Sequence, residues 1–396
     1  MKDWNKLLLI GVLLFLSVTL RSQVQLRADN VDIDYKNQVW TLRNKVFMNA
    51  KKHSLQADEM YYYRSEKRFF ATGSLFIHFY EENRKVWGDF LEQKDNIKTV
   101  RGNPLKVVDR EGKREITASN LTMTEGKKKS MTFLGNVKIK EDDSIISSDK
   151  IVYYEDQGKI DLPGMSLISK PQENLEIRSR DVVYNEKNKE SVFVNPVDIK
   201  RKDGTIKADG GTYAEKEDSL NLKGNIVYKE EKRSINSDTL VSRKVGGEKV
   251  LTFEDNITLT EDDLTGTCDR VDYFEKQEII NLEGNAQLKD EKKELGIRST
   301  IITVDKKKDL VYLLGRLLVK QKDKVISGDK GIYNKETQEI AIQGNALYKK
   351  GRDVSRAEII VLNTNTNEVK MIGVQFGKFR SEGEEPPEPE KKEAQK

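Results

Sequence analysis

The sequence predicts an all-β, elongated protein built from short repeats. Apolar and polar residues alternate with a period of two through most of the chain, which is the pattern of strands with one buried face. The same pattern returns about every thirty residues, as expected of a repeat architecture. Only 36% of the 396 residues are hydrophobic and 34% are charged, a low apolar fraction for a compact globule of this size.

Composition excludes several classes of function. The chain has 70 Lys plus Arg against 66 Asp plus Glu, and a net charge of +4 gives no electrostatic reason to expect nucleic acid. One cysteine, Cys268, and two histidines, His53 and His78, are too few for a disulfide framework or a histidine-based metal or catalytic cluster. The sequence has no P-loop, Gly-x-Ser-x-Gly, paired-histidine or EF-hand motif. We therefore expect no enzyme, no metal and no cofactor, a buried, unreactive Cys268, and histidines at exposed or rim positions.

The N-terminal segment, residues 1–23, has the features of an export signal. Lys2 and Lys6 precede an uncharged apolar run, Leu7 to Leu20, which as a helix covers only ~21 Å of the ~30 Å hydrocarbon core. The possible cleavage sites lack the usual small residues, so both a cleaved signal peptide and a retained membrane anchor stay open. In either case the chain from residue 24 onward is expected beyond the inner membrane, in the periplasm.

A glycine marker divides the rest of the chain into twelve repeats. It recurs at intervals of 29 to 33 residues inside an alternating apolar run, usually before asparagine, as in LNLKGNIVYK (220–229) and INLEGNAQLK (280–289). Asn and Asp, which tolerate unusual backbone angles best after glycine, replace it three times. The marker positions are Asn44, Gly73, Gly102, Gly135, Gly164, Asn195, Gly224, Asp255, Gly284, Gly315, Gly344 and Gly373.

An aspartate marker, a small residue followed by Asp, lies midway through most repeats, as in Ala57-Asp58 and Cys268-Asp269. The apolar alternation slips by one residue there, as at a bulge or corner. Each repeat thus reads as two bent strands joined by short polar turns, which favours antiparallel hairpins. We expect each repeat to add one strand to each of two facing sheets, and the aspartate markers to bond nearby backbone N–H groups.

The repeats occupy residues 24–379, and a different composition follows them. Residues 380–396 contain three prolines and, apart from one alanine, no aliphatic side chain. Such a segment cannot bury enough apolar surface to offset its ordering entropy, so we predict a disordered tail.

Two facing sheets ordinarily fill the space between them with their own side chains, and a packed interior without a ligand is one expectation. Small residues at the corners also allow the sheets to splay around an apolar groove, which would suit acyl chains at about 0.8 kcal/mol per buried CH₂. The candidate lipid-binding residues are inner-face positions that flank the bends, whereas no catalytic or metal-binding residue is proposed. They are Leu75, Ile77, Val137, Ile139, Ile226, Tyr228, Ile257, Leu259, Leu317 and Val319.

The two markers together, [Ala/Ser]-Asp-x-φ-x-Tyr and φ-x-φ-x-Gly-Asn-φ with φ an apolar residue, resemble the OstA-like family, which includes LptA, LptC and the periplasmic domain of LptD. The resemblance covers roughly residues 24–379 and is best at 26–35, 57–79, 131–154, 205–228 and 264–288. It implies an open, twisted β-jellyroll that carries lipopolysaccharide, or a related glycolipid, through the periplasm with its acyl chains inside. It also implies partners: other jellyroll modules of the LptC and LptD type, and further copies of this chain, joined at the end strands.

The chain departs from each subtype of the family. It is about twice as long as LptA-type chains, and nothing after Gly377 could form the outer-membrane barrel of LptD-type chains. LptC-type chains keep an N-terminal anchor, which the doubtful cleavage site permits here. We expect a periplasmic lipopolysaccharide bridge protein. The alternatives are an LptC-like component anchored in the inner membrane and a purely structural β-repeat or scaffold protein of the envelope.

Overall fold

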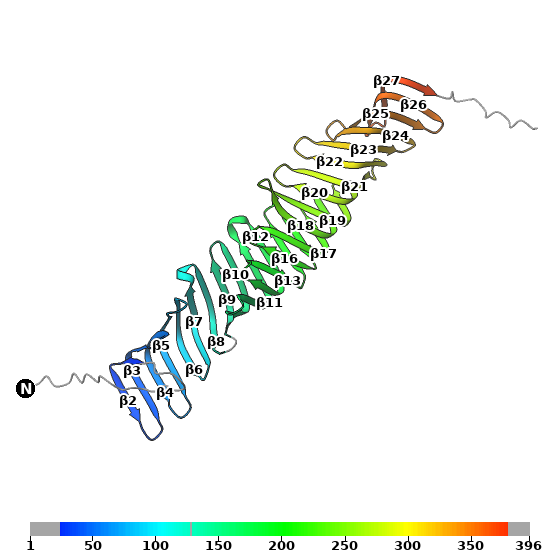
Figure 1. The fold of residues 1–396 in the computed structure, drawn as a ribbon. Coiled ribbons are helices and arrows are strands. Elements are labelled where there is room, and N and C mark those ends of the chain that lie inside the picture. Colours follow the sequence, from blue (N-terminus) through cyan, green and yellow to red (C-terminus); the bar gives the residue numbers. More distant parts are fainter. Residues whose placement is uncertain (1–23, 127–128, 379–396) are drawn as a thin grey trace, which may run out of the picture. The chain divides into compact units, whose positions relative to one another are not determined.

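The computed structural model describes residues 24–126 and 129–378 (Figure 1). Within these ranges the chain forms 27 strands and two 3-10 helices, η1 (Arg110–Gly112) and η2 (Pro171–Glu173), which confirms the all-β prediction. In the same ranges, no helix has the length and apolar character needed to span a bilayer. The signal or anchor predicted at 1–23 and the disordered tail predicted at 380–396 lie outside the described residues.

The strands belong to two compact units. The first unit comprises the residues up to Asp203 together with Asp209–Lys216, and the second comprises Gly204–Ala208 and the residues from Glu217 onward. Strands of the first unit are β1 (Gln25–Arg27), β2 (Asn30–Asp34), β3 (Val39–Asn49), β4 (His53–Tyr63), β5 (Arg68–Phe79), β6 (Arg84–Lys94), β7 (Ile97–Asp109), β8 (Arg114–Thr124), β9 (Ser130–Glu141), β10 (Ser144–Tyr154), β11 (Lys159–Lys170), β12 (Leu175–Asn185), β13 (Glu190–Phe193), β14 (Val197–Arg201) and β16 (Gly210–Ala214).

Strands of the second unit are β15 (Gly204–Ala208), β17 (Ser219–Lys229), β18 (Arg233–Val245), β19 (Glu248–Glu261), β20 (Leu264–Phe274), β21 (Ile279–Asp290), β22 (Leu295–Asp305), β23 (Leu310–Gln321), β24 (Lys324–Asn334), β25 (Glu339–Lys350), β26 (Asp353–Asn363) and β27 (Val369–Lys378). In both units the long strands pair antiparallel with their neighbours in chain order, as the predicted hairpins require. Figure 1 shows these hairpins following one another within each unit.

Every long strand changes register near its middle. In the β4–β5 pair, residues 53–56 face 76–79 and residues 59–63 face 68–72, with a bulge between the two blocks. We call the block that contains the start of β4 and the end of β5 the first layer, and the other block the second layer. The equivalent blocks in other hairpins take the same names. Each repeat therefore adds two strands to each layer. The expectation of one strand per layer was wrong, because each long strand bends and passes through both layers.

The two sequence markers meet at the bend. Gly284 and Asn285 both adopt left-handed backbone angles, with φ of +72° and +49°, and Asn285 Nδ2 donates to Asp269 Oδ2 at 3.0 Å. A Cβ atom at Gly284 would lie 2.3 Å from that carboxylate, so glycine is needed for space as well as for conformation. At other bends the aspartate marker accepts from a backbone N–H group, as predicted: Gly164 N donates to Asp181 Oδ1 at 2.8 Å and Asn103 N donates to Asp89 Oδ2 at 3.1 Å. In each of these bends the donor stands on the adjacent strand.

Residues that replace the marker glycine behave as predicted in two cases of three. Asn44 and Asp255 both have a φ of +64°. Asn195 does not adopt a positive φ. It stands between β13 and β14, which are the two halves of one interrupted strand, and its Nδ2 donates to the carbonyl of Arg180 at 3.3 Å.

The inner faces of the two layers form the core. Leu220, Leu222, Ile226 and Tyr228 are all buried, as the alternation on β17 predicts. Side chains from both layers touch: the Tyr228 ring of the first layer lies 5.7 Å, between centroids, from Phe253 of the second layer. Cys268 is buried, as expected, and burial raises the pKa of its thiol to about 12.

Candidate functional site

The ten candidate lipid-binding residues all lie on the inner face. Their side chains are buried against other protein side chains, with exposed fractions of 0 to 5%. All ten belong to the first-layer half of glycine-marker strands, close to the bend, and Ile139 also lines a cavity. In the described structure the inner face is therefore filled by the chain's own residues, so acyl chains would have to displace protein contacts.

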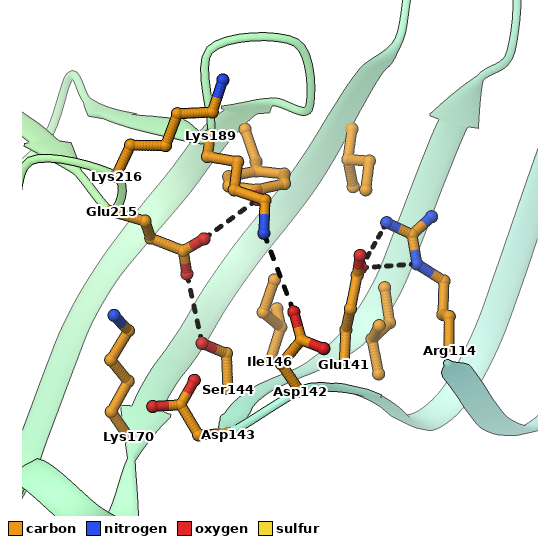
Figure 2. Close-up of a pocket in the computed structure, with 13 residues that line it drawn as sticks. Arg114, Glu141, Asp142, Asp143, Ser144, Ile146, Lys170, Lys189, Glu215 and Lys216 are labelled. Atoms are coloured by element: carbon orange, nitrogen blue, oxygen red, sulfur yellow. Dashed lines mark hydrogen bonds and ion pairs between the residues drawn. The ribbon is translucent and has the colours of Figure 1, made fainter. Parts of the chain in front are cut away.

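A cavity of about 300 Å³ opens in the first unit, at the low end of the volumes typical of ligand pockets. Its deeper wall consists of the aliphatic residues Ile139, Ile146 and Ile160. Polar and charged side chains form the rest of the lining, and Figure 2 shows them projecting from opposite strands. These are Arg114, Glu141, Asp142, Asp143, Ser144, Lys170, Tyr184, Lys189, Glu215 and Lys216.

The cavity lies on what we call the polar seam. This is the line, on the side away from the bends, along which the strand ends and turns of the first layer meet those of the second layer. In the first unit three contacts that cross it recur in successive repeats: Arg84 Nη2 to Glu155 Oε1 at 2.6 Å, Arg114 Nη2 to Glu186 Oε1 at 2.5 Å, and the Ser144 hydroxyl donating to Glu215 Oε1 at 3.2 Å. Lys189 Nζ also lies 3.8 Å across it from Asp142 Oδ2. The partners in the three recurring contacts are 71, 72 and 71 residues apart. The layers are thus offset by slightly more than two repeats, and the same crossing recurs in successive repeats.

Arg114 contacts two carboxylates at this seam, one in each layer. Its side chain is only 3% exposed and also donates from Nε and Nη2 to Glu141 Oε2, at 2.8 and 2.5 Å, within its own layer. Burial alone would lower the pKa of the guanidinium, but the carboxylates of Glu186 and Glu141 raise it above its usual value. Arg114 therefore stays charged in a dry environment, where such a charge needs its partners.

The second unit has a seam of opposite polarity. Here the first layer supplies the carboxylates and the second layer supplies the cations: Lys306 Nζ lies 3.7 Å from Glu230 Oε2, and Lys335 Nζ lies 3.2 Å from Glu261 Oε1. The buried Arg233 binds Glu261 Oε2 at 2.5 Å. Burial alone would raise the pKa of Glu261, but Arg233 and Lys335 hold it below its usual value.

The sequence predicted which residues face inward, but it did not predict the polar seam. A signal was present: charged or polar residues stand at the first position of several aspartate-marker strands, as Arg84, Arg114 and Arg233 do. His53 occupies the same position in β4, part-buried at the rim as predicted, where burial and the charge of Lys98 lower its pKa to about 4. Among the described residues, no group of three or more His, Cys, Asp or Glu side chains is arranged to hold a metal ion.

The terminal strand β27 forms an exposed edge of the second unit. It pairs with β26, and Ile372, Val374 and Phe376 are 44, 56 and 59% exposed. An uncovered apolar edge strand offers backbone groups and side chains to another strand.

Comparison with known proteins gives one family. A sequence model described as "LptA/(LptD N-terminal domain) LPS transport protein" matches residues 115–244 and 176–310, two overlapping spans offset by about two repeats. Among solved structures, the chain is similar to LptH, "the LptA homologous periplasmic component of the conserved lipopolysaccharide transport device from Pseudomonas aeruginosa". That similarity has 16% identity and a TM-score of 0.25, and it covers 27% of this chain and 80% of that one. No curated protein matches.

Proposed function

Because the chain belongs to the OstA-like family of LptA and LptD N-terminal domain transport proteins, we propose that it carries lipopolysaccharide, or a related glycolipid, through the periplasm. The observation that carries the proposal is the inner face: in repeat after repeat it presents buried aliphatic side chains on both layers. In this role the protein binds and moves lipid and performs no chemistry on it.

Acyl chains can replace protein contacts without a large loss of free energy only if the inner face remains shielded from water. An acyl chain gains about 0.8 kcal/mol for each CH₂ removed from water. Residues such as Ile226 and Leu317, which are buried against neighbours, would exchange one apolar contact for another when the layers separate around the chain. The ten inner-face residues are the proposed contacts, with the headgroup outside.

Site-specific photo-crosslinking in cells tests the proposal. A photoreactive residue at Ile139, Ile226 or Leu317 should give a lipopolysaccharide adduct. The same residue at Leu318, one position along β23 and on the outer face, should not. Absence of an adduct at every inner position, with the protein present at normal levels, contradicts lipid transport.

The exposed edge of β27 supports the bridge arrangement, in which other OstA-like modules or further copies of the chain add to the end strands. Val374→Asp and Phe376→Asp together should weaken such association, since charges on an edge strand oppose pairing. Light scattering over a range of protein concentrations checks this. A monomer at all concentrations that also captures no related module would show that the end strand has no such role.

A structural or scaffold function is the second candidate, because the inner face is filled by the protein's own side chains. An LptC-like tethered form differs from both only in whether residues 1–23 remain attached. Mass spectrometry of the purified protein separates the two functions: glycolipid that co-purifies in stoichiometric amount favours transport, and its absence favours the scaffold. The mass of the mature chain shows whether residues 1–23 are removed.

A further inference from the structure

We propose that the polar seam is a latch through which acyl chains enter the jellyroll sideways, and that it opens first at the Arg114–Ser144 cavity. This inference rests on the proposed function, since it concerns the route of the same lipid. The free ends of the jellyroll give the other possible route, along the axis of the strand stack.

Among the described residues, the contacts given across the seam are made by side chains and not by paired strands. At the bends the strands run continuously from one layer to the other, whereas along the seam the described layers meet through side chains. In the second unit Gln321 Nε2 donates to the carbonyl of Thr364 at 2.7 Å across the same line. Sideways access to the inner face therefore requires breaking side-chain bonds but no strand ladder.

The latch is divided into small, repeated parts. Arg84, Arg114 and Ser144 stand thirty residues apart, and each reaches one carboxylate of the opposite layer. One crossing can open while the next stays shut, because each contact belongs to its own repeat. A chain that enters at one repeat can advance to the next by the same local opening, without separation of the whole length.

The cavity marks the weakest crossing in the first unit. Next to the charged Arg114–Glu186 contact, the layers are joined by the Ser144–Glu215 hydrogen bond at 3.2 Å and by Lys189 and Asp142, whose charged atoms are 3.8 Å apart and well exposed. Ile139, Ile146 and Ile160 lie behind these groups. An amphiphile meets charged groups at the rim and aliphatic groups beneath, which matches its own polarity. Figure 2 shows the crossing contacts over this space.

Removal of one carboxylate tests the latch. Glu186→Gln breaks the charged contact across the seam and leaves the buried Arg114 with less compensation when the seam is shut, so the open form gains population. We expect lipid A with a fluorescent acyl group to load about tenfold faster, which corresponds to about 1.4 kcal/mol. Glu92→Gln is the matched control: Glu92 binds Arg68 at 2.5 Å within the second layer, so its loss should leave the loading rate unchanged.

A reversible lock tests the same idea in the other direction. In a Cys268→Ala background, Ser144→Cys and Glu215→Cys joined by a short reducible thiol crosslinker should slow loading at least tenfold, and reduction should restore it. Equal rates in the locked, reduced and Glu186→Gln proteins, with normal binding at equilibrium, overturn the latch and leave the proposed function intact. Absence of any binding at equilibrium in the unmodified protein overturns the proposed function itself. Circular dichroism of each variant confirms that it is folded.

Discussion

Gly284→Ala should destabilise the second unit by about 2–3 kcal/mol, although it adds only one methyl group. The left-handed backbone at this position costs an alanine roughly 1–2 kcal/mol. The new Cβ would also lie 2.3 Å from Asp269 Oδ2, which forces that carboxylate away from its bond to Asn285 Nδ2. Loss of that hydrogen bond adds about 1 kcal/mol.

Urea unfolding measures this cost against a close control. Gly296 lies in the neighbouring strand β22 and has no atom within 4 Å of an added Cβ, so Gly296→Ala should be neutral or slightly stabilising. The double variant Asp269→Ala/Gly284→Ala should cost less than the sum of the single changes, because the collision is gone. Equal effects of Gly284→Ala and Gly296→Ala would refute the assignment of the bend to these two markers.

Three further predictions concern single side chains. The folded protein lowers the pKa of His53 to about 4, below its unfolded value near 6.5, so the unfolded state binds the proton first as the pH drops. The free energy of unfolding should therefore fall between pH 6.5 and pH 4, by ~2 kcal/mol at about pH 5. Urea unfolding of His53→Leu should not show this pH dependence. Leu317→Ala should cost 2–5 kcal/mol by leaving a core cavity, whereas Leu318→Ala on the outer face should cost less than about 1 kcal/mol; equal values would place Leu317 outside the core. Because the pKa of Cys268 is raised to about 12, N-ethylmaleimide should label it at neutral pH only after denaturation, and rapid labelling of the native protein would show that its strand opens.

The features that could be predicted from the sequence are those that depend on neighbouring residues. Alternation assigns Leu220 and Leu222 to the inner face because a strand has a fixed period of two. A glycine followed by asparagine indicates a left-handed pair because few other residues accept it, and Gly284 with Asn285 has that conformation. The packing of Asp269 against Gly284 was not predicted, although the two markers stand 15 positions apart here and in the pairs Asp58–Gly73 and Asp329–Gly344, which pack in the same way.

The features that could not be predicted depend on how the layers meet. A slip in the apolar alternation marks a bend but does not show whether the strand continues into the second layer, and so the number of strands per layer was wrong. Seam partners such as Arg114 and Glu186 are separated by 72 residues, which is not a multiple of the thirty-residue period. The offset follows from the twist and stagger of the bent strands, and neither is visible in a single repeat.

The use of charged groups at the seam itself leads to a last prediction. When an ion pair opens into water, both charges regain hydration, whereas an apolar contact of the same size exposes hydrocarbon at roughly 25 cal/mol per Å². A polar seam should therefore hold the layers in register yet open at small cost. The variant Arg114→Met/Glu141→Gln/Glu186→Leu replaces this crossing by apolar contacts and should shut the seam more tightly. We expect it to be at least as stable as the unmodified protein in urea and to load fluorescent lipid A several-fold more slowly, the reverse of Glu186→Gln. Faster loading by this stable triple variant would mean that the charges themselves, and not the ease of parting the layers, control the route.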